Sequence, residues 1–333
     1  MKAIFLCESA GKIFRVYDEK AVCQLTNLVE IEKKIYTKAD VLDEPARFSD
    51  VEIIFSTWGM PVFTEEEIKA CFPALKCVFY GAGSVQYFAR PFLECGVKVF
   101  SAWAANAVPV AEMTVAQIVM ANKGYFSLNR LYNIKRQNIY DESFCQCHGN
   151  YGETVGIIGV GMIGNLVVQM LKAYNLNVIV FDPFLSDEKA AALGVEKCDL
   201  ATLFERSAVV SNHLANNAQT VGMLNYELFA KMRQDATFIN TGRGAQVVEG
   251  DLARILQERS DLTALLDVTD PEPVEEGHLF YTLPNCYLTP HIAGSKGNEV
   301  ARMGEYMLRE CQAYLNDEAC RYEVTVKMLE TMA

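Results

Sequence analysis

The chain has 333 residues, 51% of them hydrophobic, and a formal net charge of −12. This length favours two domains, and no uninterrupted apolar run reaches the roughly 18 to 20 residues that cross a bilayer. The composition therefore predicts a soluble globular protein without a membrane partner. The acidic surplus argues against a nucleic-acid partner, so positive charge for an anionic ligand must come from individual arginines.

The amino-terminal residues predict a cytoplasmic protein. Residues 3–6 form only a short apolar run, whereas a signal-peptide core needs about 7 to 15 residues. The 11 cysteines show no recurring pair spacing, which suits reduced thiols in a cytosol. Cys145, Cys147 and His148 form one tight cluster. Because no second pair of ligands accompanies it, we interpret it as a solvated loop and predict no metal site.

Apolar runs then alternate with segments of helical period along the whole chain, a pattern typical of parallel sheets with helices on both faces. In the first hundred residues, strands are predicted at 3–6, 34–36, 53–56, 77–80 and 97–100. Residues 108–121 are apolar on nearly every side, which predicts a helix buried against two surfaces, as in a hinge or a dimer contact. Residues 132–153 are polar and aperiodic, and we expect a long connection there.

A new unit begins with a glycine-rich motif. Gly159, Gly161 and Gly164 follow a predicted strand at 155–158 and precede a predicted helix at 165–174. The first glycine permits a tight turn, the second lets the backbone approach a pyrophosphate, and the third lets helix and strand pack closely. The start of the helix supplies free N–H groups for the phosphates.

Asp182 ends the next predicted strand, at 177–181. A carboxylate there can accept hydrogen bonds from both hydroxyls of an adenosine ribose and would repel a 2′-phosphate, which favours NAD over NADP. The alternative is a glycine-rich turn of a flavodoxin-like unit with a capping aspartate. Strand, helix, strand and acid occur in register, which favours the nucleotide.

The remaining strands each end at polar residues. Strands predicted at 209–211, 237–240, 263–266 and 287–289 run into Asn212 and His213, Thr241 and Arg243, Asp267, and His291. Because the carboxyl ends of parallel strands share one edge, where ligands bind, we expect these side chains to converge.

For Arg243, one of these residues, and for His278 an ordinary role is the alternative. Arg243 could cap a helix, but its flanking glycines indicate backbone held close to another group, with the guanidinium free to bind a carboxylate or carbonyl. His278 lies in an acidic stretch and is interpreted as a loop residue. His291 follows a proline at a strand end and precedes small residues, as a side chain directed into a crevice would.

Together these segments resemble the D-isomer-specific 2-hydroxyacid dehydrogenases over nearly the whole chain. The matching segments are "GAGSV", "NAVPVAE", "GVGMIG", "FDP", "INTGRG", "LLDVTDPEP" and "LTPHIAG". The resemblance implies that His291 is the acid/base, that Glu272 is its partner carboxylate, and that Arg243 binds the carboxylate and carbonyl of the substrate. Hydride delivery to a keto carbon builds negative charge on oxygen, which calls for a proton donor and a cation beside it.

The resemblance also assigns the cofactor and substrate contacts. Asp267 would hold the nicotinamide carboxamide. His213, Thr241, Gly294 and the backbone at Met162 and Ile163 would line the rest of the NAD. In the first half, the loops with Trp58, Gly59 and Met60 and with Ala82 and Gly83 would offer backbone N–H groups to the substrate carboxylate, and Trp58 and Met60 would shape the side-chain pocket.

The fold implied is α/β, with two doubly wound parallel sheets. Residues 1–104 and 296–333 would form a flavodoxin-like substrate domain around a Rossmann NAD-binding domain at 105–295, and a homodimer is expected through the helix at 108–121. The expected function is an NAD-dependent oxidoreductase for a small 2-keto or D-2-hydroxy acid. One alternative is an NAD(H)-binding sensor or corepressor-type scaffold without turnover. Another is formate or phosphite oxidation, against which Glu272 argues.

Overall fold

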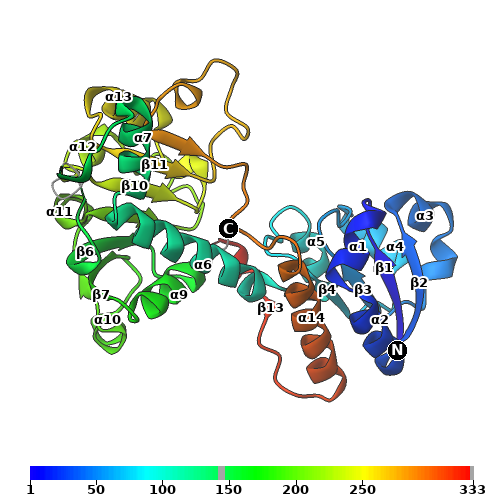
Figure 1. The fold of residues 1–333 in the computed structure, drawn as a ribbon. Coiled ribbons are helices and arrows are strands. Elements are labelled where there is room, and N and C mark those ends of the chain that lie inside the picture. The colour runs from blue at the N-terminus through cyan, green and yellow to red at the C-terminus, as the bar shows by residue number, and fades with distance from the viewer. Residues whose placement is uncertain (142–146, 331–333) are drawn as a thin grey trace. The chain divides into compact units, whose positions relative to one another are not determined.

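The computed structural model describes residues 1–141 and 147–330. The chain divides into unit 1, formed by Met1–Asn106 and Ser295–Ala333, and unit 2, formed by Ala107–Gly294. Figure 1 shows unit 1 in blue, cyan and orange-red and unit 2 mainly in green and yellow. The boundaries lie within two residues of those expected from the sequence.

Unit 1 contains a six-stranded sheet in the order β13-β5-β4-β3-β1-β2. The strands are β1 (Lys2–Leu6), β2 (Glu30–Tyr36), β3 (Ile53–Ser56), β4 (Cys77–Tyr80), β5 (Lys98–Ser101) and β13 (Glu323–Val324). Only β13 is antiparallel to its neighbour. The parallel order 2-1-3-4-5 is that of a flavodoxin-like sheet, which confirms the predicted class.

Helices cover both faces of this sheet because alternate strand residues point to opposite sides. Ile4 and Leu6 face one core cluster and Phe5 faces the other. The first cluster lies under α3 (Lys38–Asp43), η1 (Pro45–Phe48), α4 (Glu65–Cys71) and α5 (Ala89–Glu94). The second lies under α1 (Ala10–Val16), α2 (Glu19–Leu28) and α14 (Glu299–Leu315), which Figure 1 shows on the same side of the sheet. The tail, which ends in η4 (Met328–Glu330), thus returns to unit 1.

Unit 2 contains a seven-stranded, fully parallel sheet in the order β12-β11-β10-β9-β6-β7-β8. The strands are β6 (Tyr151–Ile158), β7 (Asn175–Phe181), β8 (Glu196–Lys197), β9 (Val209–Asn212), β10 (Thr237–Asn240), β11 (Thr263–Leu266) and β12 (Cys286–Leu288). Numbered within the unit, the order is 3-2-1-4-5-6 with one further strand, the order of a dinucleotide-binding sheet. The predicted Rossmann unit is therefore confirmed.

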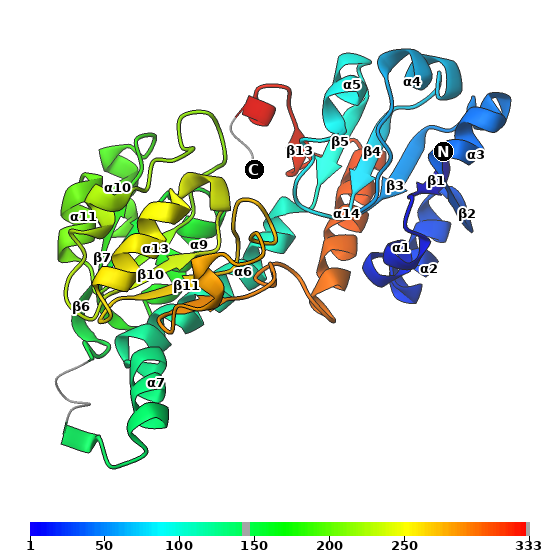
Figure 2. The same ribbon diagram turned by 90° about the horizontal axis from the view of Figure 1, so that it is seen from above.

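Two layers of helices cover this sheet. One contains α11 (Leu200–Arg206), α12 (Tyr226–Phe229), α13 (Glu249–Glu258) and η3 (Leu279–Tyr281). The other contains α6 (Trp103–Asn122), α9 (Met162–Leu171) and α10 (Asp187–Leu193). By contrast, α7 (Tyr125–Lys135) has no buried residue and extends away from both layers in Figure 2.

Helix α6 is longer than the helix predicted at 108–121. It begins five residues before the apolar stretch at 108–121 and contains Pro109. Its first residues pack in the core of unit 1 and its last in that of unit 2. Among the described residues it is the one helix long and apolar enough to cross a membrane by length and composition, although 56% of the apolar window is buried inside the protein. The sequence contains no uninterrupted apolar run of membrane-spanning length, but this helix reaches that length because it includes a few polar residues.

The connection predicted at 132–153 is shorter than expected. Helix α7 continues to Lys135, and β6 begins at Tyr151. Cys145 of the cysteine–histidine cluster lies outside the described residues. Within them, His148 contacts Glu153 (Nδ1 to Oε2, 3.3 Å) and the carbonyl of Gln234 (Nε2 to O, 3.1 Å), and no group of three or more His, Cys, Asp or Glu side chains is arranged to hold a metal.

Candidate active site

The three glycines of the motif have three different environments. Gly159 has φ +84°, and a Cβ there would lie 2.8 Å from the carbonyl oxygen of His213. At Gly164 a Cβ would lie 2.0 Å from the carbonyl oxygen of Gly159, so helix and loop can approach only because this residue is glycine. Around Gly161, by contrast, nothing lies within 4 Å of the Cβ position. The middle glycine therefore leaves open backbone where a pyrophosphate can approach.

The helix after the motif begins three residues earlier than the predicted helix at 165–174. Gly161 is the N-cap in extended conformation, and α9 starts at Met162. The first bond within the helix runs from the N–H of Asn165 to the carbonyl of Gly161, at 2.9 Å. The N–H groups of Met162, Ile163 and Gly164 consequently have no partner within the helix and are available to an anion.

Asp182 lies at the end of β7, as predicted, and holds two backbone amides. Its carboxylate accepts a hydrogen bond from the N–H of Val160 at 2.7 Å and another from the N–H of Phe184 at 2.8 Å. The first of these bonds connects the strand end to the glycine loop. Asp182 thus has a structural role that the sequence did not reveal, beside the ribose contact expected of it.

His291 and Glu272 form a direct pair. The Nδ1 atom of His291 lies 2.8 Å from Oε1 of Glu272, and the two side chains are 47% and 41% exposed. A carboxylate only accepts, so Nδ1 carries a proton and donates it. The opposite ring nitrogen, Nε2, is then the one that can give or take a proton from another molecule.

A buried carboxylate holds the turn that carries His291. Asp267, only 2% exposed, accepts hydrogen bonds from the Thr289 hydroxyl (2.6 Å) and from the N–H groups of Ile292 and Ala293 (both 2.8 Å). His291 itself has φ +51°, in the left-handed region that non-glycine residues rarely adopt. The bonds to Asp267 compensate for this unfavourable conformation.

Arg243 lies on a turn that packs against the segment carrying Glu272. A Cβ at Gly244 would lie 2.0 Å from the carbonyl carbon of Thr269, so glycine permits this approach. Burial lowers the pKa of the Arg243 guanidinium, and the nearby charge of Glu272 opposes that shift. One of its nitrogens donates to the carbonyl of Gly242 at 2.8 Å. Within unit 2, Glu272 thus pairs with His291, and its charge also acts on Arg243.

Sequence reasoning missed a buried amide network that positions this turn. The side chain of Asn212 donates to Asn240 Oδ1 (3.0 Å) and to Gln246 Oε1 (2.6 Å), and Asn240 donates to the carbonyl of Arg243 (3.0 Å). The polar ends of β9 and β10 therefore converge, as predicted. The strand ends at Asn212 and Asn240 were a usable signal, whereas nothing local pointed to Gln246, in η2 (Gly244–Gln246).

The other predicted cofactor residues lie in different surroundings. His213 is 8% exposed, its Nε2 contacts the Ser211 hydroxyl at 3.0 Å, and its Nδ1 has no partner among the described residues. Burial lowers the pKa of His213 to about 3. Thr241 is buried, with its hydroxyl 3.1 Å from that of Thr114 in α6. Met162 is 47% exposed at the start of α9, and Gly294 ends unit 2.

The predicted substrate residues lie in two loops of unit 1, after β3 and β4. Trp58 is 36% exposed, and Gly59 has the left-handed φ of +103° that favours glycine. Met60 and Ala82 are buried, and their N–H groups donate within their own loops, to Thr57 (2.9 Å) and Tyr80 (2.9 Å). No internal bond of this kind is found for the N–H groups of Gly59 and Gly83 in the described chain.

The sequence of this chain matches that of a known protein family. A sequence model described as "D-isomer specific 2-hydroxyacid dehydrogenase, NAD binding domain" matches residues 115–293, more than half of the chain. The chain belongs to the D-isomer specific 2-hydroxyacid dehydrogenase family. Residues 115–293 are its NAD-binding domain, and NAD is the cofactor. The open backbone at Gly161, the N–H groups at the start of α9 and the His213 Nδ1, which has no partner in the described part of the chain, fit a bound dinucleotide.

A curated relative and two solved structures illustrate the likeness. The D-3-phosphoglycerate dehydrogenase of Methanocaldococcus jannaschii is 30% identical over 303 residues, 90% of this chain and 56% of that protein. The chain spans about half the length of the curated relatives it matches. The apo structure of Rhodotorula graminis D-mandelate dehydrogenase has a TM-score of 0.81 at 18% identity and 97% coverage of both chains. The NAD-complexed D-isomer specific 2-hydroxyacid dehydrogenase of Lactobacillus delbrueckii has a TM-score of 0.74 at 21% identity, covering 98% of this chain and all of that one. These structures support the fold.

Proposed function

We propose that the protein reduces a small 2-keto acid to a D-2-hydroxy acid with NADH, or catalyses the reverse oxidation. The observation that carries this proposal is the pair formed by His291 Nδ1 and Glu272 Oε1 at 2.8 Å, beside a guanidinium that responds to the charge of Glu272. An oriented imidazole next to a cation is what carbonyl reduction requires.

Each member of the trio has one task in this scheme. NADH supplies the hydride when bound. Arg243 binds the carboxylate and keto oxygen of the substrate and stabilises negative charge as it develops on that oxygen. His291 donates its Nε2 proton to the same oxygen. Glu272 keeps the ring oriented through Nδ1 and stabilises the protonated ring. In oxidation, neutral His291 takes the hydroxyl proton back.

The remaining predicted residues contribute binding. Gly159, Gly161, Gly164 and the start of α9 would hold the pyrophosphate, Asp182 the ribose hydroxyls, and His213, Thr241, Asp267 and Gly294 would surround the rest of the cofactor. The unit 1 loops with Trp58–Met60 and Ala82–Gly83 would contact the substrate. Unit 1 would thus be the substrate domain of a cytoplasmic enzyme.

The test compares NADH oxidation by the native protein, His291→Gln, Glu272→Gln and Arg243→Lys over a panel of 2-keto acids. We expect the His291 variant to lose about 10²- to 10⁴-fold in kcat, the range of general acid catalysis. His278→Gln serves as the matched control, because His278 caps η3 through the N–H of Phe280 (3.2 Å) outside the trio. Equal rates for the native protein and His291→Gln would remove His291 from the chemistry.

The alternative, an NAD(H)-binding sensor or scaffold, makes a different prediction. Such a protein would bind NADH tightly, oxidise it with no keto acid in the panel, and change its assembly state when NADH is added. The intact His291–Glu272 pair favours turnover instead, because a scaffold has no use for an oriented acid/base. Formate oxidation is disfavoured by the same pair.

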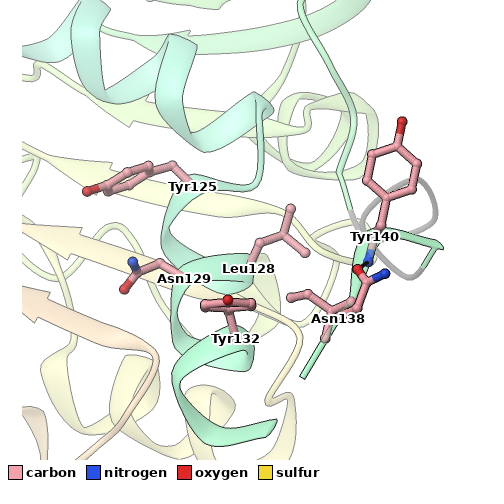
Figure 3. A pocket seen from close by; sticks show the side chains of 7 residues that line it. Tyr125, Leu128, Asn129, Tyr132, Asn138 and Tyr140 are labelled. Carbon is pink, nitrogen blue, oxygen red and sulfur yellow. Dashed lines mark hydrogen bonds between the residues drawn. The ribbon is translucent and has the colours of Figure 1, made fainter. Parts of the chain in front are cut away.

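We also propose a homodimer. The contact expected at residues 108–121 lies in α6, which is largely packed into the core of its own chain, so we place α7 in the interface instead. Tyr125 and Tyr132 are 53% and 57% exposed on this helix. Figure 3 shows them with Leu128 and Tyr140 around a hollow beside α7, which contains none of the proposed site residues. Light scattering should give twice the 37.2 kDa chain mass, and Tyr132→Glu should shift the protein toward the monomer. A native monomer would refute this proposal.

A further inference from the structure

Two tyrosine hydroxyls meet at the carboxyl end of the unit 1 sheet, and the mechanism above uses neither. Tyr80 is the last residue of β4 and is 1% exposed, whereas Tyr87 lies in the turn before α5 and is 48% exposed. Their hydroxyl oxygens are 3.4 Å apart. Tyr87 thus shows half of its surface to solvent while its hydroxyl group stays anchored to a buried partner.

This pair lies beside the position where such a sheet binds ligands. The strand order changes direction between β1 and β3, and ligands bind outside the carboxyl ends of the strands at that point. The loop after β3 is fixed there, since Gly59 accepts a hydrogen bond from the N–H of Glu8 at 2.8 Å and its Cβ position lies 3.1 Å from Cys7 Sγ.

Tyr87 reaches this loop from the neighbouring one. Burial raises the pKa of its phenol, and the amides of Gly59 and Met60 lie close enough to its oxygen to oppose that shift. The side chain therefore connects the loop after β4 with the loop after β3, the two loops proposed to contact substrate. A group in this position contacts whatever part of the substrate enters between them.

The hydrogen-bond directions can be derived from burial. Among the described residues the Tyr80 hydroxyl has one hydrogen-bond partner, Tyr87. If Tyr87 donated to Tyr80, the Tyr80 proton would be buried without an acceptor, which is unfavourable. Tyr80 therefore donates to Tyr87. The amide N–H groups can only donate as well, so the Tyr87 oxygen is an acceptor for protein groups and its own proton remains available to a ligand.

The charge around this hydroxyl argues against an anionic ligand group. Apart from burial, the pKa of Tyr87 responds to Tyr80, Cys7 and two amides, none of which is an Arg or Lys side chain. Lys12 and Glu8, which both act on the pKa of Cys7, carry opposite charges. The ammonium of Lys38 is held by Glu67 and the carbonyl of Val62, both at 2.7 Å. A phosphate or second carboxylate is normally bound by Arg or Lys. The site offers a neutral donor instead.

We propose that Tyr87 determines substrate specificity by donating a hydrogen bond to an uncharged oxygen on the side chain of the 2-keto acid, such as a hydroxyl group on the carbon next to the keto group. This inference rests on the proposed function. It implies that hydroxylated keto acids are preferred over hydrocarbon ones of equal size and over phosphorylated ones, because a site built around a polar contact rejects analogues that lack it.

The experiment uses a matched pair of substrates and a matched pair of variants. Hydroxypyruvate and 2-ketobutyrate have side chains of nearly equal size that end in a hydroxyl and a methyl group. We expect the native protein to prefer hydroxypyruvate by at least about tenfold in kcat/KM. Tyr87→Phe should lower kcat/KM about five- to tenfold more on hydroxypyruvate than on 2-ketobutyrate, because the loss of the acceptor for Tyr80 affects both substrates alike. Tyr151→Phe, an 86% exposed tyrosine of unit 2, should change neither value.

Three outcomes would overturn the inference. Equal losses on both substrates would mean that Tyr87 only supports the loops, and equal activity of native protein and variant on hydroxypyruvate would remove the contact. A preference for phosphohydroxypyruvate over hydroxypyruvate would show that the site binds an anion. These results leave 2-keto acid reduction intact. By contrast, failure of the native protein to oxidise NADH with any 2-keto acid would overturn the proposed function and this inference with it.

Discussion

Asp267 and His291 are joined through the backbone as well as through the turn between them. The N–H of His291 donates to the carbonyl of Asp267 at 3.0 Å, while the Asp267 carboxylate accepts three hydrogen bonds from Thr289, Ile292 and Ala293 on either side of the histidine. The buried carboxylate therefore fixes the left-handed residue from which the imidazole projects. This arrangement gives Asp267 a positioning role in addition to the cofactor contact that the family resemblance implies.

Asp267→Asn should therefore affect turnover more than NADH affinity. The amide of the variant can accept only through its oxygen, and its NH₂ group would oppose the N–H of Ala293, which should lower the free energy of unfolding by about 3 kcal/mol. A turn displaced by about 1 Å costs roughly 100-fold in kcat. Urea unfolding, NADH titration and steady-state rates measure the three quantities. Thr289→Val removes only the hydrogen bond from the Thr289 hydroxyl to Asp267. It should therefore lower the stability, the NADH affinity and kcat less than Asp267→Asn does. A variant with native kcat but weak NADH binding would favour the cofactor role alone.

The glycine motif allows a prediction that separates folding from binding. Gly164→Ala places a methyl group against the carbonyl of Gly159, 2.0 Å away, and should destabilise unit 2 by at least about 2 kcal/mol, the range for overpacking. Gly161→Ala meets no atom within 4 Å and has an ordinary φ of −70°. It should keep native stability and yet weaken NADH binding at least about tenfold, because the methyl group occupies the approach of the pyrophosphate. Thermal unfolding and fluorescence titration test both, and native NADH affinity in Gly161→Ala would refute this placement of the cofactor.

Much of this fold could be predicted because its central strands are buried on both faces. The strands predicted at 53–56, 77–80, 237–240 and 263–266 coincide with β3, β4, β10 and β11, since a continuous apolar run bounded by polar residues is visible in the sequence. The two-residue strands β8 and β13 were not predicted, because tertiary pairing at a sheet edge determines them. The start of α9 was misplaced because its N-cap is a glycine without a capping side chain.

The site was predictable to the extent that its residues end strands or belong to motifs. Arg243, Glu272 and His291 were named from the sequence, and the structure pairs His291 with Glu272, whose charge acts on Arg243. The supporting contacts could not be predicted, because they join segments far apart in the chain. Gln246 meets Asn212 across 34 positions, and Tyr80 meets Tyr87 only because a turn folds back over β4. Nothing local in the sequence distinguishes Gln246 or Tyr87 from ordinary polar residues.

Asp182 should determine the choice between NADH and NADPH. Its carboxylate can accept from the ribose hydroxyls and would repel a 2′-phosphate, so the native protein should bind NADH at least about 100-fold more tightly. Asp182→Ala should reduce this ratio to below about ten and also loosen the glycine loop, because the bond to the N–H of Val160 at 2.7 Å is lost. Asp182→Asn, which retains an acceptor oxygen, separates the two effects. Titration of each protein with both nucleotides gives the ratios. Preference of the native protein for NADPH would show that the carboxylate does not face the ribose.

His213 should make the stability of unit 2 sensitive to mild acid. Burial lowers its pKa from 6.5 to about 3, so the folded protein holds the ring neutral while the unfolded chain protonates it near pH 6.5. The contribution is fully present above the unfolded pKa and is lost as the pH falls from about 6.5 toward 3, by about 1.4 kcal/mol per pH unit within that window. Carboxylates of the protein titrate in the same pH range. The informative quantity is therefore the difference in unfolding free energy between the native protein and His213→Gln. Urea unfolding at pH 7.5, 6 and 5 should show that the variant loses less stability on acidification than the native protein does. Parallel losses in the two proteins would mean that the buried ring takes up its proton without unfolding, through the unpartnered Nδ1.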